Sequence, residues 1–174
     1  MTESFRGFTR QELDAYEIRE ETPDHWIIPV WGRAGIWYER THCEAGCHPK
    51  YSAPRGSASH LYNPLGLGPQ SPEVWLAEGE FDTLSLVCAG IPAVGILGAD
   101  NFKEEWWLLY LGAEIVLALD PDPKGRETMD RMSMILDAKQ NRYSIFDPSP
   151  YSDLNEWFEK DRRQFEKAVL FHGL

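Results

Sequence analysis

The feature that most constrains the fold of this chain is an alternation of short apolar runs and amphipathic segments beginning at Val74. The short runs read VWLAE, AVGIL, EIVLALD and YSIFD. They are apolar on both faces, as strands buried between two layers of helices must be. Gly90 and Gly112 stand where the first two intervening helices are expected to end. We therefore predict a β-α-β-α-β-α-β unit, an α/β fold with a mostly parallel sheet flanked by helices.

The region before this alternation has a different pattern of predicted secondary structure. Residues 9–12 read TRQE, which fits a capping box and predicts a short helix running to about Tyr16. Residues 26–31 and 36–40 are rich in β-forming side chains and are separated by GRAG, which predicts a β-hairpin. Residues 41–72 are rich in Gly, Pro, Ser and His, which is typical of loops and short strands.

The chain therefore divides into three parts. Residues 1–72 are expected to form a small N-terminal α+β subdomain, and residues 73–150 the domain of the parallel sheet. Residues 151–174 are expected to form a C-terminal helical extension that completes this domain, as two short helices. A length of 174 residues, with 43% hydrophobic and 26% charged residues, suits one globular domain with a small appended subdomain.

The charge and hydropathy of the sequence bear on DNA binding, membrane insertion and cellular location. The net charge of −11 argues against strong nonspecific DNA binding, which depends on Lys and Arg neutralising phosphates. Residues 31–60 are locally positive, with four Lys or Arg against two Glu, so weak intrinsic DNA affinity is expected. No run approaches the roughly 20 apolar residues of a membrane helix. The first residues lack the apolar region of a secretory signal, so we expect a cytoplasmic protein.

The cysteines favour neither a disulfide framework nor a metal site. An odd number, three, without an export signal indicates reduced thiols. Cys43, Cys47 and His48 form a C-x3-C-H pattern beside His42, which is half of a possible zinc site. Structural zinc usually takes a second ligand pair at a similar spacing, and the sequence offers none. We therefore expect an ordinary loop here, without zinc.

Acidic side chains follow two of the predicted strands. Asp120 and Asp122 stand at the end of EIVLALD, and Glu78 ends VWLAE. The carboxyl ends of neighbouring strands line a common crevice in a doubly wound sheet. Converging carboxylates repel one another unless a cation neutralises them, and carboxylate oxygens suit Mg²⁺ or Mn²⁺. The alternative is that Glu78 simply begins a helix, that the two aspartates decorate a turn, and that none of them meet.

The helix after the second acidic motif adds basic residues. Gly125 opens this helix, and Lys124 and Arg126 stand near its start, where they are placed to meet a phosphate.

The stretch from Val74 to Asp147 resembles the TOPRIM domain shared by DnaG-type primases, topoisomerases and certain nucleases. The glutamate motif of that domain is similar to EGEFD at residues 78–82, and its D-x-D motif to LDPDPKG at residues 119–125. The resemblance implies a Rossmann-like TOPRIM fold with a metal-dependent phosphoryl-transfer site. Topoisomerases also need a nucleophilic Tyr on an additional domain, for which this chain has no room.

Two further similarities favour a primase. SDLNE at residues 152–156 resembles the D-x-N-E element of phage primases and primase-helicases, which places Asp153 near the metal site. From the residues alone, a helix N-cap at Ser152 or Asp153 is equally good. Upstream, the order of Arg6-Gly7, the hairpin and Pro49-Lys50-Tyr51 resembles the N-terminal subdomain of the primase core.

The resemblance thus implies the catalytic core of a DNA primase, a nucleotidyltransferase that makes RNA primers on single-stranded DNA from ribonucleoside triphosphates with Mg²⁺ or Mn²⁺. A TOPRIM nuclease or RNA-maturation phosphodiesterase and a noncatalytic replisome subunit stay open as alternatives. The sequence has no G-x-x-x-x-G-K-[ST] loop and no zinc ribbon, so a separate helicase or zinc-binding template-recognition protein is expected.

The resemblance also assigns roles to nine residues. The catalytic residues are Glu78, Asp120 and Asp122; the metal-site residues are these three with Asp82 and Asp153; and the residues for nucleotide or template binding are Arg40, Lys50, Lys124 and Arg126.

Overall fold

The computed structural model describes residues 4–32, 35–63, 71–104, 106 and 112–172. Its second half is built on a four-stranded sheet in the order β10-β9-β7-β8, in which every neighbouring pair is parallel. The strands are β7 (Glu73–Ala77), β8 (Ala93–Gly95), β9 (Glu114–Ala118) and β10 (Tyr143–Ile145). This confirms the predicted α/β fold with a parallel sheet.

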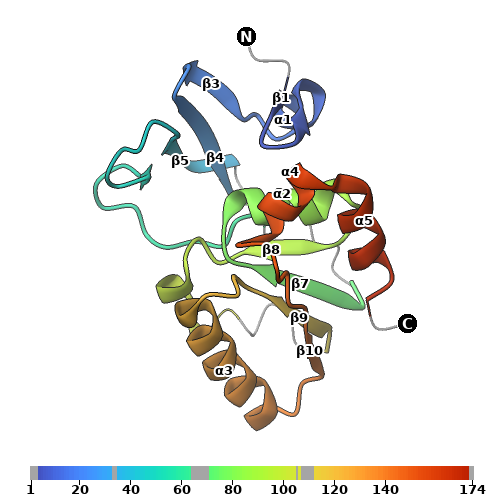
Figure 1. The fold of residues 1–174 in the computed structure, drawn as a ribbon. Helices are drawn as coiled ribbons and strands as arrows, with labels where there is room; N and C mark the ends of the chain where they lie inside the picture. Colours follow the sequence, from blue (N-terminus) through green and yellow to red (C-terminus); the bar gives the residue numbers. More distant parts are fainter. Residues whose placement is uncertain (1–3, 33–34, 64–70, 105, 107–111, 173–174) are drawn as a thin grey trace.

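Helices cover both faces of this sheet. They are α2 (Glu80–Cys88), α3 (Pro123–Ala138), α4 (Leu154–Lys160) and α5 (Arg162–Leu170), with a 3-10 turn at Ala99–Asn101. Figure 1 shows α3 on one side of the sheet and α2, α4 and α5 on the other. Strand β7 explains the two layers, because Val74 and Leu76 pack in one core with α3, while Trp75 and Ala77 pack in the other. The two helices predicted near the C-terminus are confirmed.

The N-terminal part is a second, antiparallel sheet with a short helix. Its strands are β3 (Arg19–Thr22), β4 (His25–Gly32), β5 (Gly35–Cys43) and β6 (Tyr51–Ser52), in that order across the sheet. Strands β1 (Ser4–Phe5) and β2 (Phe8–Thr9) form a small hairpin before α1 (Arg10–Ala15). Thr9 and Glu12 make the predicted capping box, and β4 and β5 make the predicted hairpin.

Aromatic packing joins the N-terminal part to the parallel-sheet domain. The ring of Phe5 packs edge-on against Phe81 of α2 with centroids 5.6 Å apart, and the ring of Phe8 stacks on Phe158 of α4 at 4.9 Å. Gly7 has a φ of +80°, and a Cβ there would lie 2.9 Å from the Cα of Glu159, so only glycine allows this close approach. The turn between β1 and β2 is therefore seated directly on α4.

One sequence expectation is wrong, and another lies largely outside the described residues. A disulfide joins Cys43 and Cys47, where reduced thiols were expected. The reason is local, because the loop after β5 turns back and leaves the two Cα atoms 5.9 Å apart. The second helix of the predicted alternation, which was expected to end at Gly112, falls mostly outside the described residues. Among the described helices, none has the length and apolar character needed to cross a membrane.

His42 on β5 is a buried titratable group that links the two parts. Its side chain is fully buried, and its ring lies 4.6 Å from Tyr51 and 5.3 Å from Phe81. The Nε2 atom lies 2.6 Å from Oε1 of Glu44, while Nδ1 has no hydrogen-bond partner among the described residues. Burial lowers the pKa of His42 to about 4, although the Glu44 carboxylate opposes this effect.

We expect His42 to make the fold less stable in mild acid. An unfolded His titrates near pH 6.5 and the folded one near 4, so the unfolded chain binds more protons between these values. The contribution of His42 to the free energy of unfolding should therefore fall by on the order of 2 kcal/mol as pH drops through this window. Urea unfolding at several pH values measures it.

The control for this prediction is His42→Phe, which keeps an aromatic ring among the same neighbours and removes the titration. Its stability should depend less on pH between 6.5 and 4 than that of the wild type. Equal profiles for wild type and His42→Phe would contradict the assignment.

Candidate active site

Strand order places two acidic side chains at one edge of the parallel sheet. Strands β7 and β9 are direct neighbours, and Ala77 pairs in register with Ala118 at their carboxyl ends. Glu78 follows β7 immediately, and Asp120 follows β9 after one further residue. The sheet thus brings to one edge two acids that are far apart in the sequence, as the strand-end pattern predicts.

A pocket of about 270 Å³ opens at this edge, and residues of both the N-terminal sheet and the parallel-sheet domain line it. Its acidic lining residues are Glu78, Glu80, Asp82, Asp120 and Asp153. Its basic lining residues are Arg6, Arg40 and Lys50. Carboxylates and cations from distant parts of the sequence therefore share one small space, which is the arrangement needed to hold metal ions and phosphates together.

The carboxylates in this pocket hold protons more tightly than usual. Burial raises the pKa of Asp120 to about 9, and the negative charges of Asp82, Glu78 and Asp153 add to the rise. Burial also raises the pKa of Asp82 to about 7, helped by Asp153. Burial raises the pKa of Glu78 as well, against a backbone hydrogen bond from Ala99. Crowded acids of this kind are costly without a cation to neutralise them.

The start of α4 brings two of these acids together. The backbone N–H of Asn155 donates to Oδ1 of Asp82 at 3.0 Å, and its side-chain amide donates to Oγ of Ser85 at 3.2 Å. Asp153 caps α4 by accepting the N–H of Glu156 at 2.6 Å, and it also lines the pocket. Both sequence interpretations of Asp153, helix cap and pocket acid, therefore describe the same side chain.

Asp122 is placed differently from Asp120. Its side chain is exposed and caps α3 by accepting the N–H of Gly125 at 2.7 Å. Its charge still raises the pKa of Glu78 and of Asp120, so it lies within electrostatic range of the cluster. The role of Asp122 as a metal ligand stays a prediction.

Gly125 allows α3 to start against the backbone of Asp120. A Cβ at Gly125 would come closer than 3.0 Å to the carbonyl oxygen of Asp120, a contact that real side chains do not make. The glycine in the second acidic motif is thus required by packing, because any side chain would push the helix start away from the acid.

Gly125→Ala is expected to destabilise the fold and to displace Asp120. The clash is with rigid backbone, so we expect a loss of roughly 2 kcal/mol in the free energy of unfolding. A displacement of the acid by about 1 Å should lower any activity of the site about 100-fold. Glu127→Ala, at an exposed position of the same helix, is the control and should change neither. Unaltered stability and activity of Gly125→Ala would contradict this packing role.

The four predicted basic residues divide into two pairs. The first pair, Arg40 and Lys50, lines the pocket. Arg40 forms an ion pair with the buried Glu80, and its guanidinium lies 4.8 Å from the ring centre of Tyr51. The side chain of Lys50 is exposed. At the start of α3, Lys124 is exposed, and Arg126 is exposed and donates to the carbonyl of Pro121 at 3.0 Å.

Several residues of the pocket were not selected from the sequence. Arg6 lines it and donates to Oε1 of Glu44 at 2.6 Å, and Asn155 and Tyr51 line it too. Arg6-Gly7, Tyr51 and Asn155 all lie within the motifs that carry the primase resemblance, so the signal was present. What the sequence did not show was which of their side chains turn inward.

The donor chemistry of the pocket residues suits a divalent cation. Oε2 of Glu78 is buried and has no hydrogen-bond partner in the described part of the chain. Buried carboxylate oxygens are normally satisfied, so this unpaired oxygen, in the same pocket as Asp120 and Asp82, is suited to be a metal ligand. Oxygen ligands from carboxylates suit Mg²⁺ or Mn²⁺.

Comparison with known proteins agrees with this geometry. Residues 75–158 match the model of the Toprim-like family. The Gene 57 protein of Mycobacterium phage D29 is 37% identical over 98 residues, which cover 56% of this chain and 62% of that protein. The DNA primase of Thermotoga maritima is 37% identical over 100 residues, which cover 55% of this chain and 17% of that protein. The chain therefore matches less than two thirds of either curated relative.

Solved structures match nearly the whole chain. The primase fragment of the bacteriophage T7 primase-helicase protein superposes with a TM-score of 0.72 and 17% identity, covering 95% of this chain and 72% of that one. A DnaG primase catalytic domain bound to single-stranded DNA gives a TM-score of 0.62 with 18% identity, covering 92% and 57%. Residues 75–158 therefore form a Toprim-like domain, and the chain has the fold of a DnaG-type primase catalytic core.

Proposed function

We propose that this chain is the catalytic core of a DNA primase, which joins ribonucleotides into short RNA primers on a single-stranded DNA template. The observation that carries the proposal is the pocket where Glu78, Asp82 and Asp120 face Lys50 and Arg40. Nucleotidyl transfer needs both groups, because cations must stabilise a triphosphate while acids hold the metal ions that activate it.

Glu78, Asp120 and Asp82 are the proposed metal ligands, with Asp122 and Asp153 as additional or water-mediated ligands. When bound, Mg²⁺ or Mn²⁺ supplies Lewis-acid stabilisation of the attacking and leaving oxygens. Burial raises the pKa of Glu78, Asp82 and Asp120, which supports this proposal, because a bound cation stabilises the ionised form of such carboxylates.

The basic residues have a separate task in this proposal. Lys50 is exposed on the loop before β6 and is free to reach a triphosphate or the template from the N-terminal side. Arg40 is held by Glu80 and Tyr51, so it contributes a fixed positive charge at the pocket wall. Lys124 and Arg126 at the start of α3 are proposed to contact phosphate from the opposite side.

The proposed partners follow from the matched structures. One matched structure is part of a primase-helicase protein. We propose that a separate helicase or a zinc-binding template-recognition protein works with this chain. The place of action would be the bacterial or phage-infected cytoplasm, where replication occurs.

A primer-synthesis assay tests the proposal against its alternatives. The purified chain is incubated with single-stranded DNA, labelled ribonucleotides and Mg²⁺ or Mn²⁺, and products are scored for both extension and cleavage. Short RNA made by the wild type and not by Asp120→Asn supports the primase. Cleavage of the template instead would identify a TOPRIM nuclease, because the same acids can direct water at a phosphodiester. Neither product, with and without a helicase, would favour a noncatalytic subunit.

A further inference from the structure

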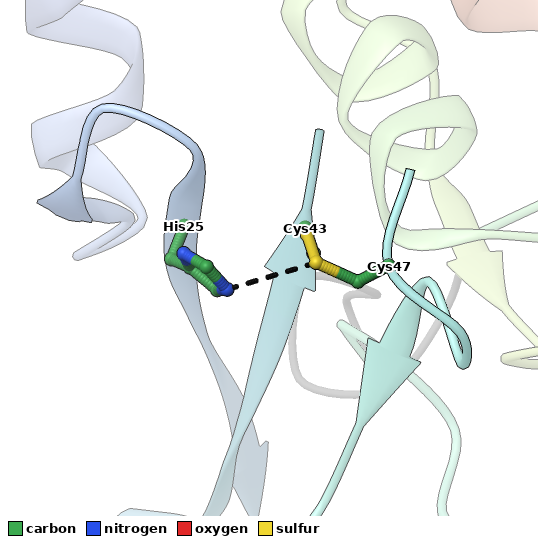
Figure 2. Close-up of side chains that lie close together, drawn as sticks. All are labelled: His25, Cys43 and Cys47. Carbon is green, nitrogen blue, oxygen red and sulfur yellow. Dashed lines mark hydrogen bonds between the residues drawn. A yellow bond between two sulfur atoms is a disulfide. The ribbon is translucent and has the colours of Figure 1, made fainter. Parts of the chain in front are cut away.

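Three side chains of the kinds that bind zinc lie together at the end of the N-terminal sheet where β4 begins and β5 ends. His25 begins β4, Cys43 ends β5, and Cys47 lies in the loop that follows. Figure 2 shows His25 pointing across the strand pair toward the two sulfurs, with a dashed line from its ring to the cysteine pair. His25 and Cys43 are direct partners in the antiparallel register, so the strand pairing fixes their proximity.

The distances from the histidine nitrogen to the two sulfurs are close to those of a zinc site. The imidazole Nε2 atom of His25 lies 3.9 Å from Sγ of Cys47, and all three ligand atoms lie within 4.8 Å of one another. Tetrahedral zinc with its usual bond lengths places a nitrogen and a sulfur ligand roughly 3.6 Å apart, and two sulfurs roughly 3.8 Å apart. The Cα atoms of the cysteines are 5.9 Å apart, so side-chain rotation alone can separate the sulfurs of the reduced pair.

A second contact orients the histidine. Oγ1 of Thr22 lies 2.9 Å from Nδ1 of His25, on the side of the ring away from the cysteines. When Nδ1 carries the proton and donates to this hydroxyl, Nε2 keeps its lone pair and faces the sulfurs. Metal-binding histidines commonly have their other ring nitrogen held in this way.

We propose that the reduced pair Cys43 and Cys47, together with His25, binds a zinc ion, with the fourth position left to water. Binding replaces two thiol protons, which are released to solvent. The sequence pattern had led us to expect no zinc because it showed no second ligand pair, and His25 is the ligand it did not reveal, since it stands on the neighbouring strand 18 positions before Cys43.

Zinc at this place would fix the loop that carries Lys50. The N–H of Cys43 donates to the carbonyl of Lys50 at 2.9 Å, so the loop between them leaves and rejoins the sheet at the proposed site. Lys50 in turn lines the candidate active site. The proposed ion therefore lies outside the carboxylate pocket and would act on it through the position of this loop.

The test measures metal in the full chain after reduction with a phosphine reductant and removal of loosely bound ions. We expect one zinc per chain, and a competing chelator should show at least roughly 100-fold weaker binding in Cys47→Ser and in His25→Ala. Thr22→Val, which removes only the contact to Nδ1, should weaken binding about tenfold. Cobalt(II) added to the reduced wild type should give the absorption of a thiolate-bound tetrahedral ion, weakened in Cys47→Ser.

Matched controls separate a site from nonspecific binding. Cys88→Ser removes the free thiol, and His172→Ala removes a histidine outside the cluster, so both should bind zinc like the wild type. Far-UV circular dichroism of each variant shows whether it is folded. A reduced, folded wild type without stoichiometric zinc, or unchanged affinity in Cys47→Ser and His25→Ala, would overturn the proposal. Neither readout depends on primer synthesis, so this site and the active site can fail separately.

Discussion

Asp120→Asn and Glu78→Gln are each expected to reduce primer synthesis by at least about 1,000-fold. Both changes keep the size of the side chain and remove one ionisable carboxylate from the lining of the pocket. The two acids lie at the carboxyl ends of neighbouring strands, so neither can be replaced by a small shift of the other. Incorporation of labelled ribonucleotides on single-stranded DNA, at saturating Mg²⁺ or Mn²⁺, measures the loss.

Asp130→Asn provides the matched control for this loss. Asp130 is exposed on α3 and does not line the pocket, so the same change of chemistry there should leave synthesis within about twofold of the wild type. Substantial synthesis by both Asp120→Asn and Glu78→Gln would show that the acids are not the metal ligands.

The same Asp120→Asn substitution is expected to stabilise the metal-free protein. Asp120 has a folded pKa of about 9 and an ordinary value of 3.8, so between these values the folded chain holds a proton that the unfolded chain releases. Stability from this group is complete below pH 3.8 and is lost as pH rises toward 9. At pH 7 the neutral Asn should therefore raise the free energy of unfolding by on the order of 2 kcal/mol.

With divalent ions present, the wild type should instead be more stable than Asp120→Asn. Metal bound only to the folded wild type adds stability by mass action, whereas the substituted pocket gains less. Urea unfolding in chelator and in millimolar Mn²⁺ compares the two proteins directly. Asp120→Asn could instead be less stable than the wild type in chelator at pH 7. Asp120 would then stabilise the fold, and the carboxylates of the pocket would not destabilise the metal-free protein.

Much of the fold could be predicted because its signals are local. The alternation from Val74 onward reflects strands buried on both faces, and the capping box at Thr9 and Glu12 depends on residues three positions apart. The edge where Glu78 and Asp120 meet was also predictable, since parallel strands end together at one side of a sheet.

Other features depended on contacts that no local pattern encodes. The sequence did not show that Arg40 pairs with the buried Glu80, or that Asp122 turns to cap α3. The disulfide of Cys43 was missed because the number of cysteines says nothing of how a loop turns, and His25 was missed because its partner lies on the next strand. The proposed division into residues 1–72, 73–150 and 151–174 stays a prediction.

Calorimetric titration of Mn²⁺ into the metal-free chain measures whether the carboxylates at the edge of the parallel sheet hold a divalent metal ion. We expect saturable binding by the wild type and by Asp130→Asn, and binding at least about tenfold weaker in Asp120→Asn and Glu78→Gln. Equal affinity for Mn²⁺ in all four proteins, or no binding by the wild type, would show that Glu78 and Asp120 are not metal ligands.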